Sequence, residues 1–165
     1  MSVPTRITAI LCIIFGLVAF GGGAATWGIV TSQLSAENIT VPKDSPLLPG
    51  AKVQDPISAY AQAEIINKHA MAATEGKTYA ELGALITAAK AAGDTAQADA
   101  LQAKRTTVMN GSFLRASLFT SVLAYGVSLL VMGLGVMFVL LGLTLNGLGN
   151  VAAPATVRAK APANA

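Results

Sequence analysis

Residues 118–145 read LFTSVLAYGVSLLVMGLGVMFVLLGLTL and contain no charged side chain. As an α-helix this run would measure about 42 Å at 1.5 Å per residue. That length exceeds the roughly 30 Å hydrocarbon core of a bilayer. The charge-free stretch around it extends over 42 residues after Arg115. The run therefore predicts a transmembrane helix that tilts or protrudes from the bilayer.

A second charge-free stretch lies near the N-terminus. It covers 30 residues between Arg6 and Glu37, and its apolar centre is residues 7–30. The alternative is a cleaved signal peptide, because Gly23-Ala24-Ala25 resembles a cleavage site. A signal peptide, however, has an apolar core of only about 7 to 15 residues. We therefore expect an uncleaved transmembrane helix.

The composition agrees with a membrane protein. The chain has 165 residues, of which 53% are hydrophobic and 12% charged, and its mean hydropathy is +0.60. A single cysteine and a single histidine exclude an intramolecular disulfide and a multi-histidine metal site within one chain. The net charge of +3 is spread along the chain without a run of basic residues, which argues against nucleic-acid binding. We expect no enzyme, no catalytic or metal-binding residue, and no cofactor bound by this chain.

The charges at the ends of the two spans predict their orientation. Arg6 precedes the first span, Arg158 and Lys160 follow the second, and no acidic residue accompanies either terminus. The positive-inside rule therefore places both termini in the cytoplasm. The segment between the spans, residues 32–112, holds all eight acidic residues and is expected outside the plasma membrane.

These observations predict an all-α membrane protein in four parts. The parts are an N-terminal transmembrane helix, an extracytoplasmic segment, a C-terminal transmembrane helix and a disordered cytoplasmic tail rich in alanine and proline. In chain order they cover residues 1–31, 32–112, 113–147 and 148–165.

The extracytoplasmic segment is expected to begin with an arm and to continue with two or three helices. Three prolines and a glycine favour an extended, polyproline-like path over residues 35–55. Asp55-Pro56 then suits the N-cap and first position of a helix. Thr78 and Glu81 have the spacing of a capping box for a second helix. A third helical stretch either breaks at Asn110-Gly111 or continues into the second span.

The core of this segment is thin. Its 81 residues contain sixteen leucine, isoleucine, valine and methionine residues and only two aromatic residues, Tyr60 and Tyr79. Such a core is poor for an independent domain of this size. We therefore expect the segment to fold against another protein.

Small residues recur on both spans at spacings that favour helix packing. Small side chains allow the backbones of membrane helices to approach closely. The sequence leaves open whether the spans pair with each other or with a partner. The residues predicted to pack are Ala19, Gly23, Ala24, Gly28, Gly126, Gly133, Gly135 and Gly142.

Aromatic residues surround Arg115 at the outer end of the second span. Arginine there is expected to snorkel to the interface beside Phe113, Leu114 and Phe119. The simpler interpretation is membrane anchoring. The more specific one is a protein contact surface, because aromatic residues and arginine are enriched at protein interfaces.

Four strings of sequence resemble a family of small two-span actinobacterial membrane proteins. The strings are PISAYAQA (56–63), HA (69–70), GKTYAEL (76–82) and VMNGSFLRASLFTS (108–121). The resemblance covers most of the chain, although the stretch 83–101 is longer than in the family. It implies an accessory subunit of the respiratory supercomplex that joins a menaquinol-oxidising cytochrome bcc complex to an aa-type cytochrome oxidase.

The leading hypothesis is therefore a non-catalytic subunit whose partners are cytochrome bcc and aa-type oxidase subunits together with membrane lipids. The alternative is a homodimeric cell-envelope sensor or adaptor that binds a lipid, peptide or glycan. A third option, an enzyme or metal protein, would have to use the only histidine. The predicted partner contacts lie in the recognised strings and offer aromatic or polar anchors: Tyr60, His69, Tyr79, Phe113, Leu114, Arg115 and Phe119.

Overall fold

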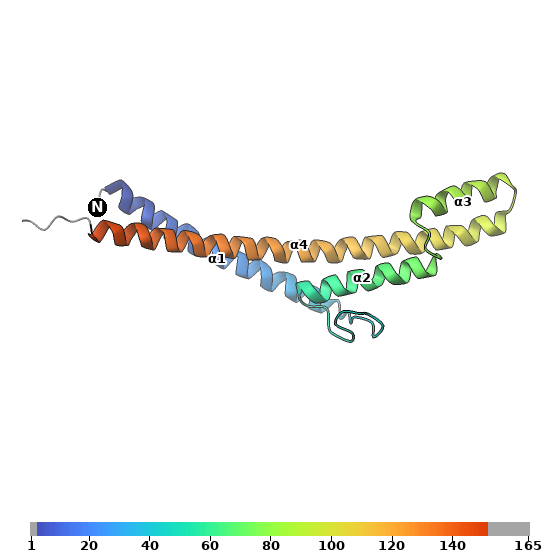
Figure 1. Cartoon of the computed structure of the whole chain (residues 1–165), viewed down its shortest axis with the longest axis horizontal. Helices are drawn as coiled ribbons and strands as arrows, with labels where there is room; N and C mark the ends of the chain where they lie inside the picture. Colours follow the sequence, from blue (N-terminus) through green and yellow to red (C-terminus); the bar gives the residue numbers. More distant parts are fainter. Residues whose placement is uncertain (1–2, 152–165) are drawn as a thin grey trace, which may run out of the picture. The chain divides into compact units, whose positions relative to one another are not determined.

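The computed structural model describes residues 3–151 of the chain, and this region is all-helical, as the sequence predicts. Outside the helices, the described region contains one isolated β-bridge, between Thr40 and Lys52. The four helices are drawn in Figure 1: α1 (Val3–Ala36), α2 (Pro56–Ala73), α3 (Tyr79–Ala91) and α4 (Thr95–Val151).

Helices α1 and α4 are long and apolar enough to cross a membrane. The core helix of a soluble protein can have the same length and composition, but most of its surface is buried. Here only 17% of the most apolar window of each helix is buried within the chain. Both helices therefore present apolar surface that this chain alone does not cover.

The chain divides into two compact units. Unit 1 comprises Met1–Ala24 with Leu129–Ala165, and unit 2 comprises Ala25–Ser128. Helices α1 and α4 each contribute to both units. Unit 1 thus contains the N-terminal part of α1 and the C-terminal part of α4, and unit 2 contains the remaining elements.

In unit 1 the two helices run antiparallel and touch through glycines. A Cβ atom added to Gly16 would lie 2.5 Å from the carbonyl oxygen of Gly135. A Cβ added to Gly142 would lie 2.6 Å from the carbonyl oxygen of Ala9. Phe15 and Phe138 flank this contact with their rings edge to face, 5.1 Å apart. The two spans therefore pair with each other, which the sequence left open.

The buried small residues of unit 1 follow a seven-residue period. Ala9, Gly16 and Gly23 are buried on α1, and Gly135 and Gly142 are buried on α4. A period of seven keeps one stripe of each helix turned toward its partner as the pair coils. Gly23, Gly135 and Gly142 were among the predicted packing residues, whereas Gly16 was not.

The other predicted packing residues are less enclosed. Ala19 is half-buried and Ala24 is exposed. A Cβ added to Gly28, Gly126 or Gly133 would meet no atom within 4 Å. Within the described chain these three glycines pack against no other helix, and their role in contacts with a partner stays a prediction.

In unit 2, α2 lies beside α4 and runs antiparallel to it (Figure 1). A Cβ added to Gly111 would lie 3.1 Å from Cβ of Ala70 and 3.7 Å from Cγ2 of Ile66, so the glycine admits α2. The main apolar cluster of this unit joins α1, the arm, α2 and α4. Its buried members are Leu34, Val41, Val53, Ala59, Ala61, Ala63, Leu118 and Tyr125.

The arm between α1 and α2 differs from the expected extended path, because it folds back on itself. The amide of Val41 donates to the carbonyl of Ala51 at 2.9 Å, and the amide of Val53 donates to Ile39 at 3.0 Å. The three prolines exclude a helix, as expected, but the valine amides remain free to pair across the arm. Val41 and Val53 are each only 1% exposed, so burial of these side chains stabilises the fold-back.

The local signals for helix starts are confirmed. Asp55 accepts hydrogen bonds from the amides of Ile57 and Ser58, and Thr78 and Glu81 form the predicted capping box. Helix α3 ends at Gly93, whose φ of +75° belongs to the left-handed region that glycine adopts readily.

Helix α4 is continuous from the α3 hairpin through the second span. Of the two alternatives at Asn110-Gly111, a break or one long helix, the structure has the long helix. Its C-terminal end reaches Val151, beyond the predicted end of the second span at residue 147. The predicted disordered tail otherwise falls on residues 152–165, which lie outside the described residues.

Two matched glycine substitutions test the contact between α1 and α4. Gly135→Ala is expected to lower the free energy of unfolding by about 1–3 kcal/mol, because its Cβ would lie 2.7 Å from two backbone atoms of α1. Gly133→Ala, which meets open space, is expected to be neutral or to stabilise by up to about 1 kcal/mol through helix propensity. Unfolding of the isolated chain in detergent measures both. Equal effects of the two variants would refute the close contact.

Candidate interaction surface

Tyr125 is the buried junction of unit 2. Its side chain is 1% exposed, and its hydroxyl donates to the carbonyl of Gln54 at 3.1 Å. The hydroxyl of Thr31 lies 2.9 Å from the same phenol oxygen. Because the single phenol proton goes to Gln54, Thr31 is the donor in this second bond. The indole of Trp27 packs against the ring, edge to face, at 4.7 Å.

Three of the predicted contact residues meet on one face of α2 and α4. Tyr60 and Phe119 lie edge to face with ring centroids 6.1 Å apart. The guanidinium of Arg115 lies 5.6 Å from the Phe119 ring and 3.7 Å from Oε1 of Glu64. We call Tyr60, Glu64, Arg115 and Phe119 the Arg115 cluster. It combines aromatic surface with a cation whose Nε is buried and has no hydrogen-bond partner in the described chain.

Phe113 and Leu114 do not join the Arg115 cluster. They are 65% and 57% exposed, respectively. Residues one or two positions apart on a helix point in different directions, so these side chains lie on other faces of α4 than Arg115. Leu114 instead lines a groove together with Ile66 of α2.

His69 ties α2 to the arm. Its Nε2 lies 2.8 Å from Oδ2 of Asp44, and Lys68 donates to the backbone carbonyl of Asp44 at 3.2 Å. The hydrogen bond from His69 holds the pKa of the Asp44 carboxyl below its usual value. A lowered carboxyl pKa means that the contact stabilises the fold above the ordinary pKa of aspartate and that this stabilisation disappears as the pH falls through the lowered value. His69 therefore serves first to hold the arm.

Tyr79 lies in a separate place, where α3 packs on α4. The guanidinium of Arg105 lies 3.9 Å from the centre of the Tyr79 ring, which is a cation–π contact. Arg105 and Arg115 are ten residues apart on α4, or about 15 Å along the helix. The predicted contact residues consequently form several sites along α4 and not one patch.

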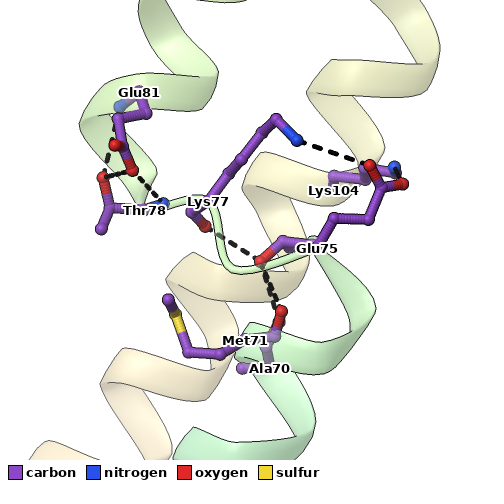
Figure 2. A network of polar contacts seen from close by, with 8 residues as sticks. Ala70, Met71, Glu75, Lys77, Thr78, Glu81 and Lys104 are labelled. Atoms are coloured by element: carbon purple, nitrogen blue, oxygen red, sulfur yellow. Dashed lines mark hydrogen bonds and ion pairs between the residues drawn. The ribbon is translucent and has the colours of Figure 1, made fainter.

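The turn between α2 and α3 carries a network of charged side chains (Figure 2). Glu75 contacts the ammonium groups of Lys104 on α4 and Lys77 in the turn. The hydrogen bond from Lys104 is the main cause that lowers the pKa of Glu75. In the same view Glu81 accepts from the amide of Thr78 at 2.8 Å, and this bond lowers the pKa of Glu81. The network fixes α3 against α4.

Sequence reasoning missed the acidic partners in these sites. Asp44 lies 25 residues before His69, and Glu75 lies 29 residues before Lys104. Neither separation is a helical repeat, so no local pattern marks the pairs. The pair of Glu64 with Arg115 joins α2 and α4 and has no signal in the sequence either.

Among the described residues, no group of three or more His, Cys, Asp or Glu side chains is placed to hold a metal ion. No protein-family model, curated protein or solved structure matches this chain. Arguments about function therefore rest on the geometry above and on the sequence.

Replacing the histidine tests the link between the arm and α2. His69→Ala is expected to raise the pKa of Asp44 toward its ordinary value of 3.8, because the hydrogen bond that lowers it is lost. Lys68→Ala is the control and is expected to raise it less, since Lys68 contributes the smallest of the lowering effects. A carboxyl-carbon NMR titration of Asp44 measures both. An equal rise in the two variants would show that His69 is not the main partner.

Proposed function

We propose that this chain is a non-catalytic accessory subunit of an actinobacterial respiratory supercomplex of cytochrome bcc and aa-type cytochrome oxidase. In this role it stabilises the assembly through contacts of its membrane helices and of its extracytoplasmic segment. The identity of the partners rests on the sequence resemblance. The need for a partner rests on the surface that the chain leaves uncovered.

The observation that carries the proposal is the exposed apolar surface of the segment between the two spans. A water-soluble surface seldom carries a large contiguous apolar patch unless the patch binds another molecule. Here the large apolar side chains are spread over the arm, α2 and α3, so several faces remain to be covered. Those at least 37% exposed are Leu47, Leu48, Ile57, Tyr60, Tyr79 and Leu85.

The proposed location is the plasma membrane, with both termini in the cytoplasm. Two apolar helices support a double span. Their antiparallel contact in unit 1 supports termini on one side, and Arg6, Arg158 and Lys160 assign that side to the cytoplasm. Residues 32–112, which carry the acidic residues, then lie outside.

The Arg115 cluster is the proposed principal protein contact. Tyr60 remains 45% exposed although its ring touches Phe119, so the cluster offers an aromatic face to a neighbour. Aromatic and arginine side chains of this kind contribute most of the binding energy in many interfaces. Phe113 and Tyr79 offer further contacts on other faces.

Affinity purification tests the proposal. The full chain, tagged and expressed in its own cells, is expected to co-purify in mild detergent with b, c and a haems at fixed stoichiometry. Tyr60→Ala combined with Arg115→Ala is expected to reduce the recovered haem about 5- to 30-fold, which corresponds to about 1–2 kcal/mol of lost contact energy. The optical spectrum and mass spectrometry of the eluate give the result.

Thr87→Ala is the matched control, because its exposed hydroxyl bonds only to the carbonyl of Gly83 in its own helix. It is expected to leave haem recovery unchanged. A colourless eluate from wild type, in a detergent that keeps the supercomplex intact, would contradict the proposal. A stable homodimer in that eluate would favour the alternative, a cell-envelope sensor or adaptor whose exposed glycines form the dimer contact.

A further inference from the structure

Unit 2 contains a groove of about 640 Å³ between the C-terminal end of α1, α2 and α4. Its volume lies within the range of about 300–1,000 Å³ that is typical of small-molecule sites. Along α1 it extends from Ile29 to Glu37, and along α4 from Ala124 to Leu114. On the proposed topology the groove therefore begins in the outer leaflet of the membrane and ends at the lipid headgroups.

The lower part of the groove is effectively apolar. Ile29, Val30 and Ala124 line it there. Two hydroxyl residues also line it, but Thr120 donates to the carbonyl of Ala116 and Ser121 to that of Ser117. Because these protons are used within α4, the hydroxyl groups do not need a ligand.

The upper part of the groove is polar and lacks partners. Oε1 of Gln62 is buried without a hydrogen-bond donor. The described part of the chain also offers no hydrogen bond or ion pair to the side chains of Gln33 and Glu37. Glu37 is the only charged residue that lines the groove. The nearby cation Arg115 does not line it and pairs with Glu64 instead.

We infer that this groove binds one membrane lipid, with an acyl chain between α1 and α4 and a headgroup that carries hydrogen-bond donors beside Glu37 and Gln62. The chemical class is an amino-phospholipid such as phosphatidylethanolamine. Its ammonium group complements the carboxylate of Glu37, whereas an anionic headgroup without an amine would be repelled. The inference rests on the membrane placement in the proposed function and adds a ligand to it.

The dimensions of the groove favour a lipid over a helix of a partner protein. Two turns of an α-helix about 10 Å wide and about 11 Å long occupy roughly 850 Å³, which exceeds the volume available. A partner helix at this depth would also bring mainly apolar side chains. These would leave Gln62 and Glu37 without donors.

Native mass spectrometry of the purified full chain tests this inference. The chain is incubated in detergent with equal amounts of phosphatidylethanolamine and phosphatidylglycerol that carry identical acyl chains. Wild type is expected to retain one lipid, with phosphatidylethanolamine favoured at least threefold. Glu37→Gln is expected to bring that ratio close to one while lipid is still retained. Ala124→Phe, which fills the apolar part, is expected to reduce retained lipid at least fivefold.

Leu140→Phe is the control, since Leu140 is 57% exposed on a part of α4 outside the groove. It is expected to change neither the ratio nor the amount of retained lipid. Circular dichroism confirms that each variant keeps its helical content. The inference is overturned if wild type shows no preference, if Glu37→Gln keeps the preference, or if folded Ala124→Phe retains as much lipid as wild type. A photo-crosslinker at Ser121 that captures protein and no lipid in cell membranes would also overturn it.

The result is independent of the cytochrome partners, because the isolated chain is used. A failed haem co-purification would contradict the proposed function and leave the lipid preference standing. A chain found in the soluble fraction, before any lipid is added, would contradict the membrane placement itself. A chain found in washed membranes without lipid selectivity would contradict only the lipid site.

Discussion

The buried hydroxyl of Tyr125 is the interaction on which unit 2 depends. A polar group near hydrocarbon is costly without a partner, and here the phenol oxygen has two, Thr31 and the carbonyl of Gln54. Gln54 immediately precedes Asp55, the N-cap of α2. One side chain therefore joins α1, the end of the arm and α4, and fixes the point on α4 at which α2 begins. The antiparallel contacts of α2, with Ile66 near Gly111, follow from that start.

Most of the helical fold could be predicted because its signals are local. Charge-free stretches mark the spans, and the caps at Asp55 and Thr78 lie within three residues of the groups they satisfy. The fold-back of the arm could not be predicted, since it depends on amide pairs that span ten residues or more. Gly16 was missed because its neighbours four residues away, Cys12 and Phe20, are not small. A seven-residue period finds it together with Ala9 and Gly23.

The candidate site was predictable only where its members share a helix. Arg115 and Phe119 lie one turn apart, so their proximity follows from the sequence. Tyr60 joins them from α2, and no spacing in the sequence indicates that. The same holds for Asp44 beside His69. The predicted contacts are correctly found on exposed or partly exposed positions, but they belong to different faces, and a single neighbour would have to surround the chain to touch them all.

The glycine contact of unit 1 also bears on the order of events during synthesis. Gly135 follows Gly16 by 119 residues. At about 5–20 residues per second, a ribosome needs roughly 6–24 s to reach the second glycine after the first. Throughout this interval, on the proposed topology, α1 lies in the bilayer with its small-residue stripe open to whatever helix is nearby. The nascent chain is thus able to exchange a temporary neighbour for its own α4, which ties the maturation of this protein to the company in which it is translated.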